Sequence, residues 1–185
     1  MRRARQTAEL FGRVAKQENN AVGQRELGTA YSAIAALLMM DGRFAESLEY
    51  SRKQLQLLEP IVAADPGNTE YTMDLPTTRA AIGYSLSWTG HAKEGVDLLR
   101  RAVTEIAKLN TSNPNTETRV NLGGIEILLG SALERKKDWD GALDAYTSAL
   151  EPFHSLAESD PSDLNDGLKS ARVSTPAMPF QRYAS

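Results

Sequence analysis

The sequence predicts an all-α protein in which antiparallel helix pairs follow one another as a solenoid. Two observations lead to this fold class. Asp-Pro or Asn-Pro steps at residues 65–66, 113–114 and 160–161 divide the chain at intervals of 48 and 47 residues. Between these steps the apolar residues follow a helical period. A long internal period of this kind is typical of repeat architectures.

The repeat extends to individual positions when the chain is shifted by 48 or 47 residues. Apolar residues then coincide with apolar residues, and small residues with small ones. The coinciding sets include Leu27/Leu75/Leu122, Ile34/Ile82/Leu129, Leu38/Leu86/Leu133 and Leu58/Ile106/Phe153. We therefore expect one structural unit that occurs three times.

These matches divide the chain into five segments. Residues 1–20 are expected to form a leading helix, half a repeat, because Leu10 stands 48 residues before Leu58. The three full repeats are expected at 21–68, 69–116 and 117–163, and a short helix and a flexible tail at 164–185. A chain that begins with half a repeat is expected to be a fragment of a longer protein.

Each repeat is expected to hold two helices of about 16–20 residues joined by a short turn. Gly42 and Gly90 break the first helix in two repeats, whereas the third repeat has Lys136-Lys137-Asp138 there. The second helix should end before the turn proline, which cannot continue a helix and restricts the preceding residue. Three more prolines should kink helices or displace their ends, namely Pro60, Pro76 and Pro152.

Small residues occupy one equivalent position in each first helix and one in each second helix. They are Ala35, Gly83 and Gly130 in the first helices, and Ser47, Gly95 and Ala142 in the second. A glycine in mid-helix costs about 1 kcal/mol relative to alanine, so we expect a compensating close contact between the two helices. We interpret these glycines as packing residues rather than as phosphate-binding residues.

A helix–turn–helix repeat with these features resembles the tetratricopeptide repeat. The resemblance covers about residues 21–163, and it is carried by Ile82-Gly83, Leu129-Gly130, Gly42, Gly90, Ser47, Gly95, Ala142, Ala102, Ala149, the segment 139–146 and the turn prolines. The period of 47–48 residues departs from the usual length of about 34. Longer helices of this kind resemble the arrays that follow the kinase domain in some bacterial serine/threonine kinases, although this chain contains no kinase motif.

The resemblance implies a right-handed superhelix whose first helices line a concave groove that binds a peptide or a partner protein. Counted from the small residue of each first helix, the candidate groove residues are Ser32, Met39, Met40, Tyr84, Trp88, Ser131, Glu134 and Arg135. Adaptable Met side chains and aromatic rings suit peptide binding. The alternative is that Met39, Met40 and Trp88 pack against the next repeat.

The composition argues against several other functions. The 185 residues include no Cys and two His, so we expect no disulfide, thiolate nucleophile, metal site or histidine-based triad. A net charge of −3 and an aromatic content of 6% do not favour nucleic acid, and no apolar run approaches the roughly 20 residues of a membrane span. We expect a cytoplasmic interaction scaffold that is not an enzyme and holds no cofactor.

Charge is unevenly distributed along the chain. Residues 1–20 carry a net charge of +3, whereas residues 117–163 carry −6. An acidic third repeat favours a basic partner, and ends of opposite charge favour head-to-tail self-association; the alternative is an ordinary solvated helix surface. The second hypothesis for function is a regulatory or dimerisation module of a larger signalling protein, such as a bacterial serine/threonine kinase.

Overall fold

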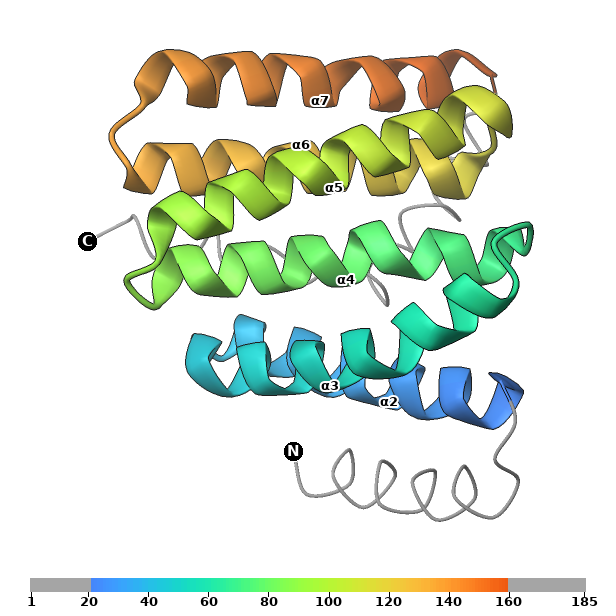
Figure 1. The fold of residues 1–185 in the computed structure, drawn as a ribbon. Helices are drawn as coiled ribbons and strands as arrows, with labels where there is room; N and C mark the ends of the chain where they lie inside the picture. The colour runs from blue at the N-terminus through green and yellow to red at the C-terminus, as the bar shows by residue number, and fades with distance from the viewer. Residues whose placement is uncertain (1–20, 160–185) are drawn as a thin grey trace.

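A computed structural model describes residues 21–159 as six α-helices without a strand in that range (Figure 1). The helices are α2 (Ala21–Met40), α3 (Phe44–Ala64), α4 (Thr69–Trp88), α5 (Ala92–Ser112), α6 (Thr116–Arg135) and α7 (Trp139–Ser159). The all-α expectation is thereby confirmed. The expected leading helix at 1–20, and the short helix and tail at 164–185, lie outside the described residues.

Helix lengths repeat as regularly as the sequence does. The first helices α2, α4 and α6 each span 20 residues, and the second helices α3, α5 and α7 each span 21, slightly more than expected. The change of interval from 48 to 47 residues arises in the connections. Four residues (65–68) separate α3 from α4, whereas three (113–115) separate α5 from α6.

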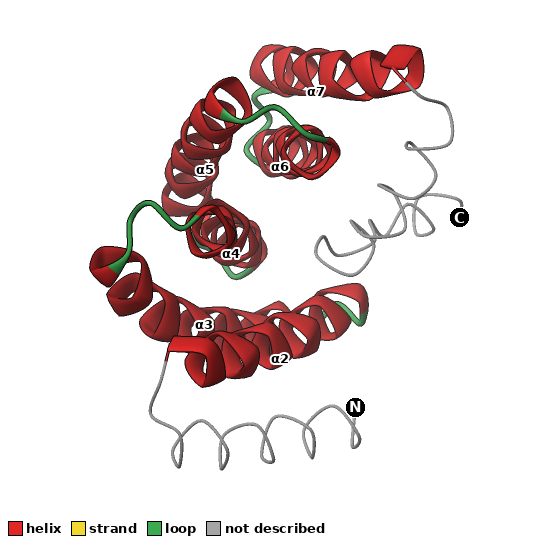
Figure 2. Ribbon diagram, turned by 90° about the vertical axis from the view of Figure 1, so that its right-hand side faces the viewer, coloured by secondary structure: helices red, strands yellow, loops and turns green. Residues whose placement is uncertain are grey.

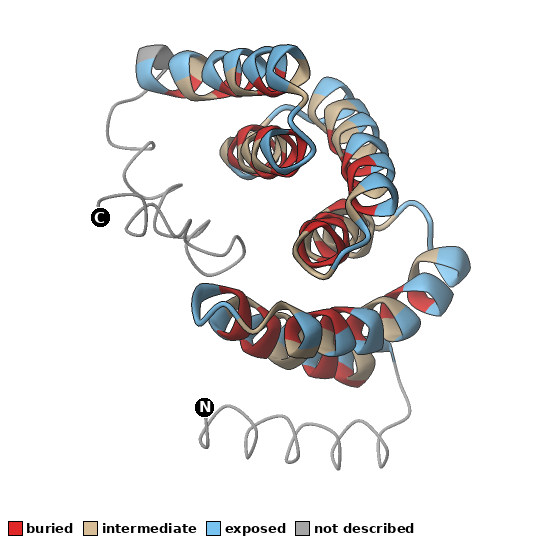
Figure 3. Cartoon of the chain, turned by 90° about the vertical axis from the view of Figure 1, so that its left-hand side faces the viewer, coloured by how far each residue is buried: buried red, intermediate tan, exposed pale blue. Residues whose placement is uncertain are grey.

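Helices adjacent in sequence pack against each other, and each first helix also contacts the next one, α2 with α4 and α4 with α6. We call these three helices the first-helix layer. The helices follow a curve, with α4 and α6 on its inner side and α5 and α7 on its outer side (Figure 2). Buried residues line the sides that face neighbouring helices (Figure 3). No helix among residues 21–159 is both long and apolar enough to cross a membrane.

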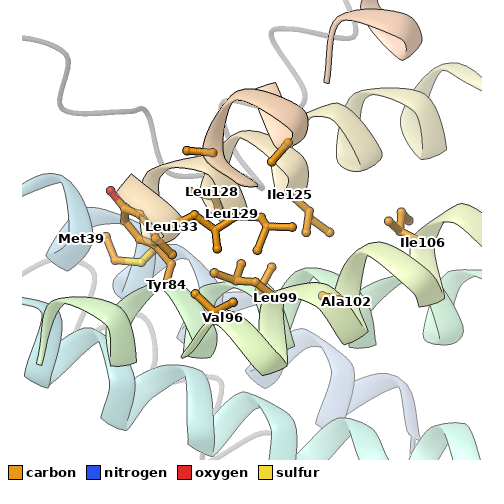
Figure 4. Packing of buried hydrophobic residues seen from close by; sticks show 14 residues of the cluster. Met39, Tyr84, Val96, Leu99, Ala102, Ile106, Ile125, Leu128, Leu129 and Leu133 are labelled. Atoms are coloured by element: carbon orange, nitrogen blue, oxygen red, sulfur yellow. The ribbon is translucent and has the colours of Figure 1, made fainter. Parts of the chain in front are cut away.

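The largest buried cluster joins the second and third helix pairs (Figure 4). One face of α5 supplies Val96, Leu99, Ala102 and Ile106, all fully buried. These side chains meet apolar residues of α4 on one side and of α6 on the other. The apolar face of a second helix therefore holds its own pair together and also joins it to the next pair.

Helix ends follow the signals in the sequence. Asp65 and Asn113 are the C-caps of α3 and α5, so the proline after each of them lies outside the helix, as expected. Asn68 caps α4 by accepting hydrogen bonds from the N–H groups of Glu70 and Tyr71. Three prolines lie inside helices without ending them, namely Pro60, Pro76 and Pro152. Of the two expected effects, displaced helix ends do not occur, and kinks stay a prediction.

The turn inside each pair has one recurring backbone conformation. Gly42 has a φ of 73° and Gly90 a φ of 91°, both in the left-handed region that favours glycine. The third turn has no glycine, and Lys137 adopts the same conformation with a φ of 61°. The third pair therefore keeps the turn geometry at a steric cost in its backbone.

The helices of each pair cross closely at the small residues. Ser47 donates a hydrogen bond to the carbonyl oxygen of Ala35 over 3.0 Å. In the second pair, a Cβ atom on Gly83 would lie 2.7 Å from the carbonyl oxygen of Gly95. In the third pair the space beside Gly130 is filled by the ring of Tyr146. The expected close contact is present in the first two pairs, and a ring takes its place in the third.

Replacing Gly83 with alanine tests this contact. The added methyl group would meet the backbone of α5, which cannot move aside as a side chain can. Overpacking of this kind costs about 1–3 kcal/mol, so we expect Gly83→Ala to lower the free energy of unfolding by about 2 kcal/mol in urea titrations. Gly28→Ala is the matched control, since its Cβ would stand 3.6 Å from Gln54 and the change should stabilise by about 0.5–1 kcal/mol. Equal effects of the two substitutions would contradict the close contact.

The third turn gives a second prediction. Lys137→Gly should raise the free energy of unfolding by about 0.5 kcal/mol, because the relieved strain of about 1 kcal/mol exceeds the added entropy of the unfolded chain. Lys136→Gly should lower it by a similar amount, since Lys136 has an ordinary φ of −79°. Thermal unfolding of the two variants would measure both effects, and a destabilised Lys137→Gly would contradict the strain.

Candidate functional site

The candidate groove residues fall at equivalent positions of the first-helix layer. Met40, Trp88 and Arg135 are the last residues of α2, α4 and α6, and we call them the terminal row. The guanidinium carbon of Arg135 lies 3.8 Å from the centroid of the Trp88 ring. Its Nε donates a hydrogen bond to the carbonyl oxygen of Ser87 over 3.1 Å. Two members of the row are thus in direct contact, although 47 residues separate them.

Trp88 belongs to an aromatic cluster that joins the first two pairs. Its ring stacks on Phe44 of α3 with centroids 4.6 Å apart, and Tyr84 contacts it edge-on at 6.1 Å. The Trp88 Nε1 atom is buried and has no hydrogen-bond partner. Phe44, the first apolar residue after the Gly42 turn, was expected on the apolar face of the second helix and was not among the candidate site residues. The partly buried Trp88 ring therefore both packs against a neighbouring pair and borders the surface.

Two candidates lie in the core instead of on the surface. Met39 is 2% exposed and Tyr84 is 3% exposed, and both belong to the main buried cluster. The Ser85 hydroxyl lies 3.4 Å from the Met39 sulfur, so Met39 packs on α4, as the alternative interpretation proposed. Met40 is different, because its side chain is 53% exposed. Met39 and Tyr84 are therefore too buried to contact a ligand, and they can affect binding only through the residues that pack on them.

Ser131 and Glu134 meet at Tyr146, a residue of α7 that was not among the candidates. The Tyr146 hydroxyl lies near both side chains, close enough for each to affect its pKa. Burial, with the nearby Glu134 carboxylate, raises the pKa of that hydroxyl well above its usual range. Because the ring also fills the space beside Gly130, Tyr146 fixes this part of the layer in place. The equivalent residues Leu99 and Ser51 are fully buried, so the repeat pattern marked this position for packing and gave no sign of contacts with the groove candidates.

Ser32 lines a small cavity at the junction of α2, α3 and α4. The cavity has a volume of about 10 Å³ and is also lined by Thr77, Ser51 and Gln54. The Ser51 hydroxyl is buried without a hydrogen-bond partner. The volume and the polar lining fit one water molecule rather than a larger ligand.

A larger depression lies between α3 and the turn that precedes α5. Its volume is about 270 Å³, and charged residues at its edge include Glu49, Arg52 and Glu94. None of the candidate groove residues lines it. Within residues 21–159, no three His, Asp or Glu side chains come together as a metal site requires.

Equivalent positions of the second and third pairs carry opposite charges. Arg79 of α4 lies 2.7 Å from Glu105 of α5 and 3.5 Å from Glu59 of α3, so it connects three helices. The equivalent residue of α6 is Glu126, whose Oε2 atom is buried without a hydrogen-bond partner. Burial and the nearby Glu151 carboxylate raise the pKa of Glu126 to about 7.

Comparison with known proteins gives no family. The chain matches no profile of a known protein family, and no curated protein matches it. Function must therefore be argued from the arrangement of the residues described above.

Glu126 makes stability depend on pH. Its folded pKa of about 7 exceeds the ordinary value of 4.5, so the folded state holds the proton more tightly, and stability falls as pH rises from 4.5 to 7. Between pH 4.5 and 7, the free energy of unfolding of Glu126→Gln should therefore rise by about 1 kcal/mol relative to that of the wild type. The effect is this small because partial exposure of Glu126 screens its charge. Urea titrations at a series of pH values would measure the difference, which should be constant above pH 7.

Asp144→Asn is the matched control for this experiment, because Asp144 is an exposed carboxylate on α7. The difference between this variant and the wild type should not follow the same pH window. A Glu126→Gln variant whose advantage is independent of pH would contradict the raised pKa.

Proposed function

We propose that the chain is a solenoid of tetratricopeptide type that serves as a cytoplasmic scaffold and binds a peptide segment of a partner protein along the first-helix layer. One observation carries the proposal. The terminal row places the exposed thioether of Met40, the ring of Trp88 and the guanidinium of Arg135 at the same end of the three first helices α2, α4 and α6. A peptide that crosses these helices would meet one contact from each pair.

The chemistry of the layer supports binding rather than catalysis. Trp88 and Met40 offer apolar contact area, which is enriched in the centre of protein interfaces. Arg135 and Glu134 are exposed and lie side by side, so they offer a charge of each sign to the polar groups of a peptide. Arg135 is held in place by the Trp88 ring and by the Ser87 carbonyl oxygen, which reduces the entropy lost on binding.

A displayed library of random peptides tests this proposal. Peptides selected on the wild-type chain should bind a Ser131→Asp, Arg135→Glu double variant about tenfold more weakly or worse, the range of a hot-spot substitution. Arg135 is exposed and Ser131 is half-buried, so the variant replaces no core side chain. Tyr84→Ala is not suitable, because Tyr84 belongs to the core.

The control is Arg100→Glu, which repeats the Arg-to-Glu charge reversal made at Arg135 at an exposed position of the outer helix α5. It should bind the selected peptides as the wild type does. Peptides that bind the double variant and the control equally well would place the binding surface elsewhere, and circular dichroism would establish that both variants are folded.

A further inference from the structure

The first and last helices of the described range carry exposed apolar side chains. Val22, Leu37 and Met40 form one stripe on α2, and Trp139, Leu143 and Leu150 form another on α7. We call these the α2 stripe and the α7 stripe. Within residues 21–159, all the large hydrophobic residues with exposed side chains belong to these two stripes. The inner helices have none, although they repeat the same sequence pattern.

Equivalent positions show what the α7 stripe would contact. Leu143 is 66% exposed, whereas the equivalent Val96 of α5 is fully buried in the cluster that joins the second and third pairs. The residue equivalent to Trp139 in the first pair is Phe44, which stacks on Trp88 of the next pair. The α7 stripe is therefore the face that a second helix turns to the following pair.

The α2 stripe is the complementary face. Leu37 is 44% exposed, whereas the equivalent residues Ser85 and Ala132 are fully buried. The Ser85 hydroxyl lies 3.4 Å from the Ser47 hydroxyl of the preceding pair. The equivalent of Met40 is Trp88, which meets Phe44 of the preceding pair. The α2 stripe is thus the face that a first helix turns to the pair before it.

We propose that the α7 stripe of one copy of this chain docks on the α2 stripe of a second copy, head to tail. The contact continues an interface that already occurs twice within the chain, between α3 and α4 and between α5 and α6. By equivalence with the Phe44–Trp88 stack, Trp139 of one copy meets Met40 of the other, and a thioether packs well against an aromatic ring. The two faces differ, so the contact is heterologous and can extend beyond two copies.

Charge supports a second copy as the occupant. The helix α7 contains four acidic residues and no Lys or Arg, and residues 117–163 carry a net charge of −6. Residues 1–20, which precede α2, carry +3. The sequence thus has opposite net charge in the segment before α2 and in the segment that contains α7, and opposite charges favour a head-to-tail encounter at low salt. The two proposals share Met40, which belongs to both the terminal row and the α2 stripe. They are tested separately, because Leu37 and Leu143 lie outside the terminal row and Ser131 and Arg135 lie outside both stripes.

Molar mass in solution tests the proposal, because each end can be blocked separately. The full-length chain has a mass of 20.2 kDa, and light scattering should show a mass that grows with concentration and falls with added salt. Leu143→Asp and Leu37→Asp should each be monomeric alone. An equimolar mixture of the two should double the mass, since each variant retains the stripe that the other has lost. The control Ser148→Asp, exposed on another face of α7, should associate as the wild type does.

A cross-linking experiment covers the case in which an aspartate variant unfolds. The chain contains no Cys, so Trp139→Cys and Met40→Cys each introduce a single thiol. A short bis-maleimide should join the two variants to each other in a mixture, and should join neither variant to itself.

Three results would overturn the proposal. A wild-type chain that stays monomeric at every concentration would assign the stripes to another occupant, whether a different protein or another segment of the same chain. Association that Leu143→Asp abolishes and Leu37→Asp preserves would indicate a symmetric contact between two α7 helices. Self-linking of Trp139→Cys alone would indicate the same symmetric contact.

Discussion

The packing of the two helices of each pair at their small residues is the constraint on which the rest of this structure depends. At Gly83 and Gly95 the two backbones leave no room for a side chain. Because the small residues fix where the two helices cross, the apolar face of a second helix contacts two first helices. The face of α5, for example, packs against α4 of its own pair and against α6 of the next pair. The next pair then repeats the arrangement, and the helices follow the curve seen in Figure 2.

The three pairs satisfy this constraint with different residues. The first pair uses a hydrogen bond from Ser47, the second uses two glycines, and the third admits the ring of Tyr146 beside Gly130. The third solution has a functional consequence, because the hydroxyl of the same tyrosine lies near Ser131 and Glu134. Packing and surface chemistry are therefore coupled at this pair, where a substitution for packing also changes the candidate binding surface.

The sequence was sufficient for the helices, because their signals are local. Apolar period, turn glycines and Asn-Pro or Asp-Pro steps each act within a few residues, and the equivalent φ of Lys137 shows that the repeat persists where its glycine is lost. The three internal prolines were less predictable, since a helix held by tertiary packing can continue through a missing hydrogen bond.

The candidate site was predictable in position but not in exposure. Counting from the small residues placed eight side chains on the first helices, yet Met39 and Tyr84 are buried because a neighbouring pair covers them. The Arg135–Trp88 contact and the buried Glu126 also depend on packing between helices. Arg79 and Glu126 occupy equivalent positions, yet Arg79 forms ion pairs and the buried Oε2 atom of Glu126 has no hydrogen-bond partner. No local sequence pattern predicts this difference.

A chain built from equivalent pairs also has an inherent asymmetry at its ends. Every boundary within residues 21–159 joins the outward face of a second helix to the inward face of the next first helix, so α2 and α7 carry different halves of one interface. In this chain both halves remain apolar, with Leu37 at one end and Leu143 at the other. A solvated end would be expected to carry polar residues at these positions. Since stability in such arrays depends on contacts between neighbouring pairs, covering either stripe should stabilise the terminal pair beneath it.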